Sequence, residues 1–270
     1  MDHYTLPRGG KESSRLNAQH NLYKDLQGYL LHPTIAASLP SKNCRIADIA
    51  CGTGTWLLDL ASSLPSHTSF TGLDISSAQF PSDSDKPANV SFRILNILEP
   101  VPEDLKGHFD AINLRLLICG LKAKDWSTAA SNAKDLLKPN GWIQWCEGDF
   151  ANQDVCPPND GQGLRDLLQY NIEISQKNGK MLYDSVRNLR TTIEGAGLKR
   201  CEEVVVSTQS QAELTESCTW VEAHAMYGLA RSLSDDLKAT EALIAQCEEG
   251  VQRGCFWSWN IHLVIGQKSS

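Results

Sequence analysis

The sequence predicts a protein of the α/β class, with a mainly parallel sheet covered by helices on both faces. Three observations support this prediction. From residue 44 onward, short apolar segments alternate with segments of helical periodicity, as expected for parallel strands joined by crossover helices. A glycine-containing turn follows the first apolar segment, and an acidic residue ends the second. In open sheets of this kind ligands bind beyond the carboxyl ends of the strands, so these two features also indicate where the functional site lies.

The segment before the sheet is expected to cover that site. We expect a loose tail over residues 1–12 and a helix over 13–31, where leucine and tyrosine recur at roughly helical spacing. Pro33 should end this helix, because the residue before a proline is pushed out of the helical region. We therefore divide the chain into an N-terminal tail and cap helix, residues 1–40, and a main domain, residues 41–270.

Seven strands are predicted in the main domain, each an apolar run bounded by turn residues. Their ranges are 45–49, 69–74, 90–95, 109–114, 142–146, 201–206 and 257–265. Helices are expected after the first strand and over residues 125–137, 161–177, 183–195, 213–233 and 235–250. The predicted helical insertions near 155–180 and 208–254 should add to the cap over the strand ends.

Composition narrows the classes of function. The net charge of -7 and the scattered basic residues disfavour a nucleic-acid partner, since such binding depends on clustered lysine and arginine. No apolar run approaches the roughly 20 residues that cross a membrane, and no signal layout begins the chain. The nine cysteines form no Cys-x-x-Cys pair, which predicts reduced thiols, no metal site and a cytoplasmic location.

The strongest functional signal is the turn after the first strand. Gly52 and Gly54 lie between that strand and a helix, where the lack of a side chain lets the backbone approach a ligand. Asp48 ends the strand, and Asp74 closes the next strand about 20 residues later, where a carboxylate can accept hydrogen bonds from ribose hydroxyls. A structural turn with an unrelated aspartate is the alternative interpretation.

A dinucleotide site uses the same elements but needs a third glycine at the start of the helix. Trp56 and Leu57 occupy that part of this sequence, and no glycine follows until Gly72. A Tyr-x-x-x-Lys pair is also missing, so a nicotinamide oxidoreductase is disfavoured.

With these residues in view, the segment 45–147 resembles class I S-adenosylmethionine-dependent methyltransferases. The resemblance lies in the first strand with its Gly-x-Gly turn, in Asp74, in Asn96-Ile97, in the fourth strand at 109–112 and in the Leu-Lys-Pro-Asn-Gly-Trp segment at 137–142. It implies a Rossmann-like seven-stranded sheet whose last strand is antiparallel, with an added helical cap. It also implies S-adenosyl-L-methionine as the cofactor.

A narrower resemblance is to methyltransferases of fungal secondary-metabolite clusters, including the gliotoxin-type N-methyltransferase. Residues 15–20, 28–33 and 74–81 carry it. Two positions depart from the wider family pattern. Ala50 replaces the first glycine of the turn, which its β-carbon tolerates only if the backbone is not left-handed, and Asn96 replaces the acid beside the adenine.

The resemblance assigns a role to each cofactor-binding candidate. Asp48 would hold the methionine amino group, Asp74 the ribose, and Arg115 the methionine carboxylate. Ile75 and Ile97 would sandwich the adenine. The remaining candidates are Ala50, Gly52 and Gly54 beneath the cofactor, Asn96 at the adenine edge, Asn113 beside the sulfonium and Tyr23 as a cover residue.

Methyl transfer needs aligned reactants and, for a nitrogen or oxygen acceptor, a base that removes a proton. Glu147 at the end of the fifth strand is the leading catalytic candidate, and His224 is the second. A polar strand end and a hydrogen-bonded structural histidine are their respective alternatives.

The sequence thus predicts a methyltransferase that acts on nitrogen or oxygen of a small natural product in secondary metabolism. A non-methylating catalyst such as a cyclase, or a catalytically silent partner protein that binds S-adenosylmethionine, remains the alternative. The oligomeric state is left open.

Overall fold

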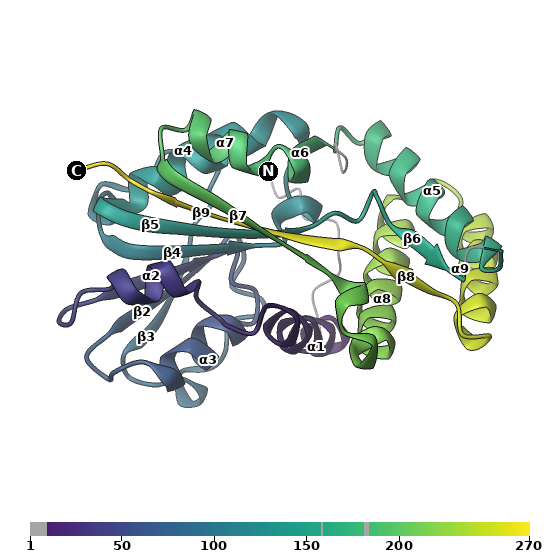
Figure 1. Cartoon of the computed structure of the whole chain (residues 1–270), viewed down its shortest axis with the longest axis horizontal. Coiled ribbons are helices and arrows are strands. Elements are labelled where there is room, and N and C mark those ends of the chain that lie inside the picture. The colour runs from purple at the N-terminus through teal and green to yellow at the C-terminus, as the bar shows by residue number, and fades with distance from the viewer. Residues whose placement is uncertain (1–9, 158, 181–183) are drawn as a thin grey trace.

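The computed structural model describes residues 10–157, 159–180 and 184–270, and a seven-stranded sheet runs through its centre (Figure 1). The strand order is β3-β2-β1-β4-β5-β9-β7. The strands are β1 (Arg45–Ile49), β2 (Ser69–Asp74), β3 (Val90–Ile94), β4 (Phe109–Arg115), β5 (Leu137–Gly148), β7 (Lys199–Ser207) and β9 (Asn260–Gln267). Strands β1 to β5 pair in parallel, whereas β9 is antiparallel to both of its neighbours. The predicted fold class is confirmed.

Helices cover both faces of this sheet (Figure 1). Helices α2 (Pro33–Ser38) and α3 (Thr55–Ser63) lie on one face, and α4 (Trp126–Leu136), α6 (Asp184–Arg187) and α7 (Leu189–Gly195) lie on the other. Adjacent residues of a strand point to opposite faces. Ile46 and Ala47 accordingly have no exposed surface, yet each belongs to a different hydrophobic cluster. The strands can therefore be apolar throughout, because each face has its own core.

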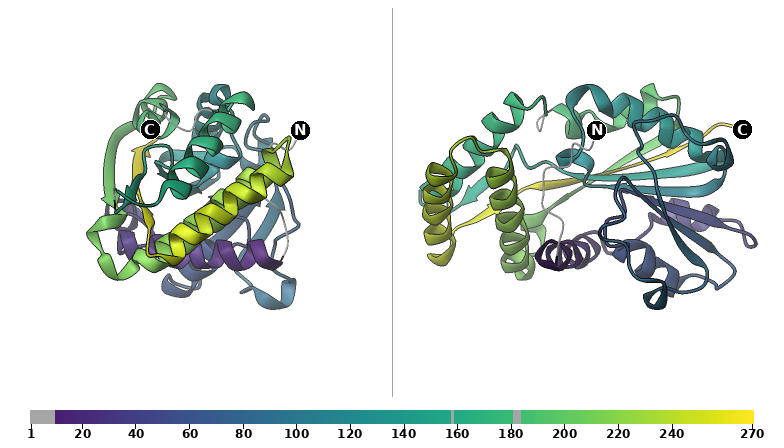
Figure 2. Two further views of the ribbon diagram at one scale, coloured as in Figure 1. Left: turned by 90° about the vertical axis from the view of Figure 1, so that its right-hand side faces the viewer. Right: turned by 180° about the vertical axis from the view of Figure 1, so that it is seen from behind.

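A second group of helices lies beyond the carboxyl ends of the strands (Figures 1 and 2). It comprises α1 (Gly10–Gln27), α5 (Gln162–Lys177), α8 (Thr215–Leu233) and α9 (Leu237–Gln252). Helix α5 packs against α8 and α9, and α1 packs against α8. The short strands β6 (Asp154–Cys156) and β8 (Phe256–Ser258) pair at the edge of this group.

Short 3-10 helices complete the described fold. They are η1 (Asp83–Asp85), η2 (Glu103–Leu105), η3 (Leu117–Cys119), η4 (Ala123–Asp125), η5 (Thr208–Ser210) and η6 (Ala212–Leu214). Within the described ranges, no helix has both the length and the apolar content to cross a membrane.

The N-terminal helix differs from its predicted bounds at both ends. Helix α1 begins at Gly10, inside the segment predicted as a tail, while the tail residues 1–9 lie outside the described part of the chain. It ends at Gln27, because Gly28 turns the backbone left-handed with φ 75°. Pro33 then starts α2 rather than ending α1, with the His32 side chain accepting a hydrogen bond from the Thr34 amide. A proline suits the first turn of a helix, where its missing N–H costs nothing.

The predicted last strand is also divided in two. Residues 256–258 form β8 and pair with β6, and the chain continues at Asn260 into β9. The sequence pattern does not reveal this change of partner, because both strands are mostly buried and read as one apolar run.

Candidate cofactor site

A cavity opens at the carboxyl ends of β1, β2, β3 and β4, where the sequence predicts the functional site. The segments that follow these strands form much of its wall, and α1 contributes another part. The lining residues from the strand ends are Asp48, Ile49, Ala50, Cys51, Gly52, Asp74, Ile75, Asn96, Ile97 and Arg115. Arg15, Leu16 and Gln19 of α1 and Ala225 of α8 close it from the cap.

Eight of the eleven predicted cofactor-binding residues line this cavity. They are Asp48, Ala50, Gly52, Asp74, Ile75, Asn96, Ile97 and Arg115. Gly54, Asn113 and Tyr23 lie outside its lining. Gly54 begins α3 instead, and its φ of 71° together with Phe92, only 2.6 Å from an added β-carbon, leaves no room for a side chain.

The Gly52 loop and Asp74 are joined directly. The Gly52 amide donates to Asp74 Oδ2 at 2.9 Å, and the Ser76 amide donates to Oδ1 at 3.0 Å. These bonds fix the carboxylate at the mouth of the β1 turn. Each carboxylate oxygen can accept more than one hydrogen bond, so Asp74 retains the capacity to accept from a ligand's hydroxyls.

Ala50 corrects one expectation. Its φ is 56°, so the backbone at this position is left-handed, the conformation that the sequence argument treated as incompatible with a side chain. A left-handed alanine is strained by about 1–2 kcal/mol. The surrounding loop holds it there: the neighbouring Cys51 amide donates to the Leu73 carbonyl, and the Gly54 amide donates to the Cys51 carbonyl. The residue is exposed and faces the cavity.

Asp48 anchors a buried polar chain that crosses three strands. Asn113 Nδ2 donates to Asp48 Oδ1 at 2.7 Å, and Gln144 Nε2 donates to Asn113 Oδ1 at 3.0 Å. The same amide of Gln144 reaches the Leu30 carbonyl, and its Oε1 accepts from the His32 amide. Asn113 therefore acts behind Asp48 rather than in the cavity.

Burial controls the charge of Asp48. Loss of solvent raises its pKa to about 7, although the Asn113 hydrogen bond and the Arg115 charge act in the opposite direction. A cationic ligand group beside Asp48 would favour the carboxylate form, since an opposite charge stabilises the ionised acid.

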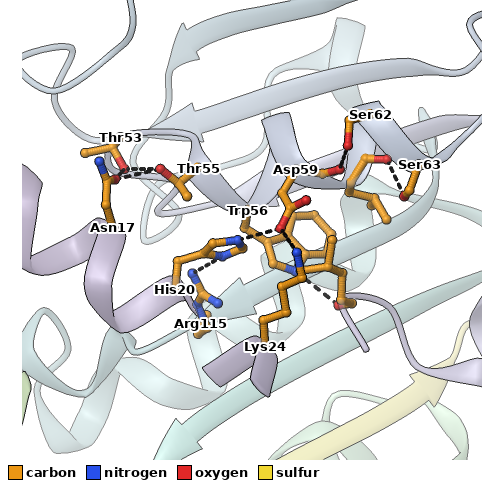
Figure 3. Close-up of polar contacts among 12 residues, drawn as sticks. Asn17, His20, Lys24, Thr53, Thr55, Trp56, Asp59, Ser62, Ser63 and Arg115 are labelled. Carbon is orange, nitrogen blue, oxygen red and sulfur yellow. Dashed lines mark hydrogen bonds and ion pairs between the residues drawn. The ribbon is translucent and has the colours of Figure 1, made fainter. Parts of the chain in front are cut away.

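Arg115 is held by α1 across the end of β4 (Figure 3). The guanidinium nitrogen Nη2 of Arg115 lies 3.4 Å from His20 Nδ1, and the guanidinium carbon Cζ lies 5.8 Å from the ring centre of Tyr23. His20 Nε2 in turn lies 3.0 Å from Asp59 Oδ2, which also accepts from Lys24 at 2.7 Å. Tyr23 thus supports Arg115 from behind, and both helix α1 and helix α3 contribute to the position of the guanidinium.

Bulky side chains stand at the start of α3, where a dinucleotide fold has a glycine. Trp56 and Leu57 are buried there, and the Trp56 indole donates to the Leu30 carbonyl (Figure 3). A dinucleotide fold needs close backbone approach at this point. The bulky side chains found here support the sequence argument against a nicotinamide site.

Glu147, the expected general base, does not line the cavity. It has no exposed surface, and its oxygens accept from the amides of Leu117 and Ile118 and from the Trp145 indole at 2.7–3.3 Å. Burial raises its pKa to about 7, although the hydrogen bonds from these three donors lower it. The carboxylate therefore holds η3, which does line the cavity.

His224, the second expected base, lies on an exposed face of α8 and outside the cavity lining. Its ring packs against Trp220 with centroids 4.2 Å apart, and its Nδ1 lies 2.8 Å from the Trp220 carbonyl. Only the neighbouring Ala225 reaches the cavity from this helix.

The sequence predicted that the N-terminal helix covers the site, but it missed the polar residues of α1 that form the wall. Arg15 and Gln19 are buried polar residues that line the cavity, and Asn17 accepts from the hydroxyls of Thr53 and Thr55 (Figure 3). The available signal was a run of polar residues in the segment that forms α1. Such a run is usually solvated, so the sequence alone had no reason to place it in a site.

Known proteins agree with this geometry. Residues 47–143 match the model of a family described as a methyltransferase domain. The chain contains a methyltransferase domain. This match begins in β1 and ends in β5, and it includes the strand-end residues of the cavity.

Curated relatives of this methyltransferase domain come from fungi. A methyltransferase from a Penicillium species is 44% identical over 154 residues, covering 54% of this chain and 52% of the relative. An N-methyltransferase from Aspergillus fumigatus is 32% identical over 150 residues, covering 55% and 51%. The chain thus matches about half the length of each of these relatives. The predicted family is confirmed, and S-adenosylmethionine is the cofactor that it implies.

A solved structure extends the comparison to the fold. The phosphoethanolamine N-methyltransferase 2 of Haemonchus contortus, in complex with S-adenosyl-L-methionine, superimposes with a TM-score of 0.53 at 16% identity. The match covers 92% of this chain and 56% of the other. It therefore includes cap helices as well as the sheet.

Proposed function

We propose that this protein transfers a methyl group from S-adenosylmethionine to a nitrogen or oxygen atom of a small molecule of secondary metabolism. The observation that carries the proposal is one cavity that gathers three complementary polar groups. Asp74 is oriented by two backbone amides, Asp48 is buried and acidic, and Arg115 presents a guanidinium. A ribose, an amino group and a carboxylate need these three kinds of partner.

The residues around these groups suit the rest of the cofactor. Ile75 and Ile97 line the cavity together with Asp74 and offer apolar surface for an adenine, and Asn96 also lines it. The Asn96 amide oxygen accepts from the Leu98 backbone, which orients the side chain. The bound cofactor supplies a methyl group that is already activated on a sulfonium. The protein's task is then to align the acceptor and exclude water.

The acceptor would enter from the cap side of the cavity. Arg15 and Gln19 of α1, Phe150 after β5 and Ala225 of α8 line that part. Their mixture of one aromatic ring with polar side chains suits a small, partly apolar molecule. The names of several fungal relatives as N-methyltransferases, at 32–35% identity, favour nitrogen as the acceptor atom. Their names as methyltransferases also favour transfer over a cyclase or a silent binding protein.

Calorimetry of the purified protein with S-adenosylmethionine, S-adenosylhomocysteine and NAD tests the cofactor first. Binding of the first two, without NAD, is the expected result, and binding of NAD alone would contradict the proposal. A second assay follows S-adenosylhomocysteine release with sets of matched small amines and phenols. Release with an amine and not with the matching phenol would assign nitrogen. Tight cofactor binding without release from any acceptor would favour the non-methylating alternatives.

A further inference from the structure

His20 lies between the half-buried carboxylate of Asp59 and the cavity arginine without being part of the cavity itself (Figure 3). The residue is 1% exposed. One ring nitrogen faces Asp59 at 3.0 Å, and the other faces the Arg115 guanidinium at 3.4 Å. The imidazole thus links α3 to β4 through α1.

The partners of His20 determine its tautomer. A guanidinium carries only N–H donors, so His20 Nδ1 must be the acceptor of this pair. The ring proton then lies on Nε2 and is donated to Asp59 Oδ2. Lys24 also donates to this Asp59 oxygen, so the carboxylate is held from two sides. A doubly protonated ring would instead point an N–H at the guanidinium.

The charges around His20 favour this neutral form. Burial lowers its pKa, the Arg115 charge lowers it further, and Lys24 contributes in the same direction. Asp59 on α3 is the opposing group and raises it. These are the charged side chains that face the ring from β4, α1 and α3.

A neutral imidazole has a specific advantage at this position. A carboxylate bonded directly to Arg115 would orient the guanidinium but would also neutralise it. Among the described residues, no carboxylate lies within ion-pair distance of Arg115. The imidazole therefore orients the guanidinium while leaving its charge available to a ligand.

We propose that His20 is a positioning residue, which in its neutral form holds Arg115 toward the carboxylate of the cofactor's methionine part and on protonation releases it. This inference rests on the proposed function, because it concerns the same cofactor. Cofactor affinity should therefore fall as the pH drops below the ordinary range of a histidine, as the ring loses its acceptor and gains a charge that repels Arg115.

The test compares two ligands that differ only in the carboxylate. Calorimetry at pH 7.5 would measure S-adenosylmethionine and its decarboxylated form, which keeps the amino group that faces Asp48. His20→Ala should weaken S-adenosylmethionine about 10-fold, since a hydrogen bond to a charged group is lost. It should leave the decarboxylated ligand within about 2-fold. His20→Gln offers an amide oxygen and an amide N–H in place of the ring nitrogens, so it should restore most of the affinity.

The pH profile separates a positioning role from a merely structural one. Between pH 8 and 5, the ratio of the two affinities should fall in the wild type and stay level in His20→Gln, because glutamine does not titrate. Asp48 also titrates in this range, but it faces the amino group that both ligands share, so the ratio cancels its effect. Two results would overturn the inference while leaving the proposed function intact. One is an equal loss of affinity for both ligands in His20→Ala. The other is an affinity ratio that falls with pH in His20→Gln as it does in the wild type. Absence of wild-type binding to either ligand would overturn both.

Discussion

The strand-end wall of the cavity and its α1 wall are assembled in different ways. Asp48, Gly52 and Asp74 belong to consecutive strand-turn units, and Gly52 bonds to Asp74 only 22 positions away. The α1 wall depends on much longer connections, since His20 meets Arg115 across 95 positions. The strand-end wall can therefore be recognised as a motif, whereas the α1 wall exists only after the helix has docked. The predictions below test whether the two walls also differ in what they contribute to ligand binding.

The largest effect is expected on the strand-end wall. Asp74→Ala should weaken S-adenosylmethionine binding about 100-fold, because two charge-assisted hydrogen bonds to ribose are lost at about 1.5 kcal/mol each. Calorimetry measures this, and Asp83→Ala is the matched control, since Asp83 lies on the exposed surface. The Gly52 amide also loses its acceptor, so the thermal midpoint should fall slightly. Wild-type affinity in Asp74→Ala would remove this residue from the site.

A second prediction concerns the carboxylate beneath the strand ends. Burial raises the pKa of Glu147 to about 7, from its ordinary 4.5. The folded protein therefore binds the proton more tightly than the unfolded chain does. Its free energy of unfolding should fall as the pH rises from about 4.5 through 7 and then level off.

Glu147→Gln removes this titration. Denaturant unfolding would measure the free energy of unfolding at pH 5 and at pH 8. The difference between the two values should be about 1–3 kcal/mol smaller in the variant than in the wild type. Glu103→Gln, on the exposed surface, should leave the difference unchanged. Asp48 and Glu222, whose pKa values burial also raises to about 7, supply the remainder of the slope. Cofactor affinity at pH 8 should stay near the wild-type value, because Glu147 does not reach the cavity. A loss of turnover with normal stability and normal pH dependence would instead return Glu147 to the role of base.

The α1 wall is tested through Asn17. Its amide oxygen accepts from Thr53 and Thr55 at 3.0 and 2.7 Å and joins α1 to the turn under the cofactor. Asn17→Ala should cost about 1 kcal/mol of stability, because both bonds are lost at an exposed position. Stopped-flow dissociation of S-adenosylhomocysteine should become roughly 2- to 5-fold faster, a range of about 0.4–1 kcal/mol. Ser14→Ala is the control, since its hydroxyl bonds only within α1. Unchanged dissociation would show that α1 does not retain the ligand.

The smallest effect is a gain in stability at the turn itself. Ala50→Gly should raise the free energy of unfolding by about 0.5–1 kcal/mol, because relief of the left-handed strain exceeds the entropy that glycine adds to the unfolded chain. Urea unfolding measures the change. Gly54→Ala is the control and should lower the free energy of unfolding, since an added β-carbon would lie 2.6 Å from Phe92. If Ala50→Gly were destabilising, the left-handed backbone would not be the source of strain.

The residues of the strand-end wall could be predicted from the sequence to a greater extent than those of the α1 wall. Motif spacing pointed to Gly52 and Asp74, and the family resemblance added Ile75 and Arg115; all four line the cavity, because consecutive βα units bring their ends to one edge of the sheet. Neither of the two predicted bases lines the cavity, and the structure gives a physical reason for each. Glu147 ends a strand as expected, but the amides of η3 turn toward it and bury it. His224 shares a helix with Ala225, yet the docking angle of α8 turns only Ala225 to the cavity.

What the sequence by itself determined about this protein is the order of its strands and helices, the glycine turn with its two aspartates, and hence the class of ligand. These features depend on local periodicity and on residues close in the chain. The tertiary structure alone decided which side chains of α1 line the cavity, that His20 stands between Asp59 and Arg115, and that Ala50 is left-handed. Such contacts join segments whose separation along the chain carries no local pattern, so they arise only when the helices pack.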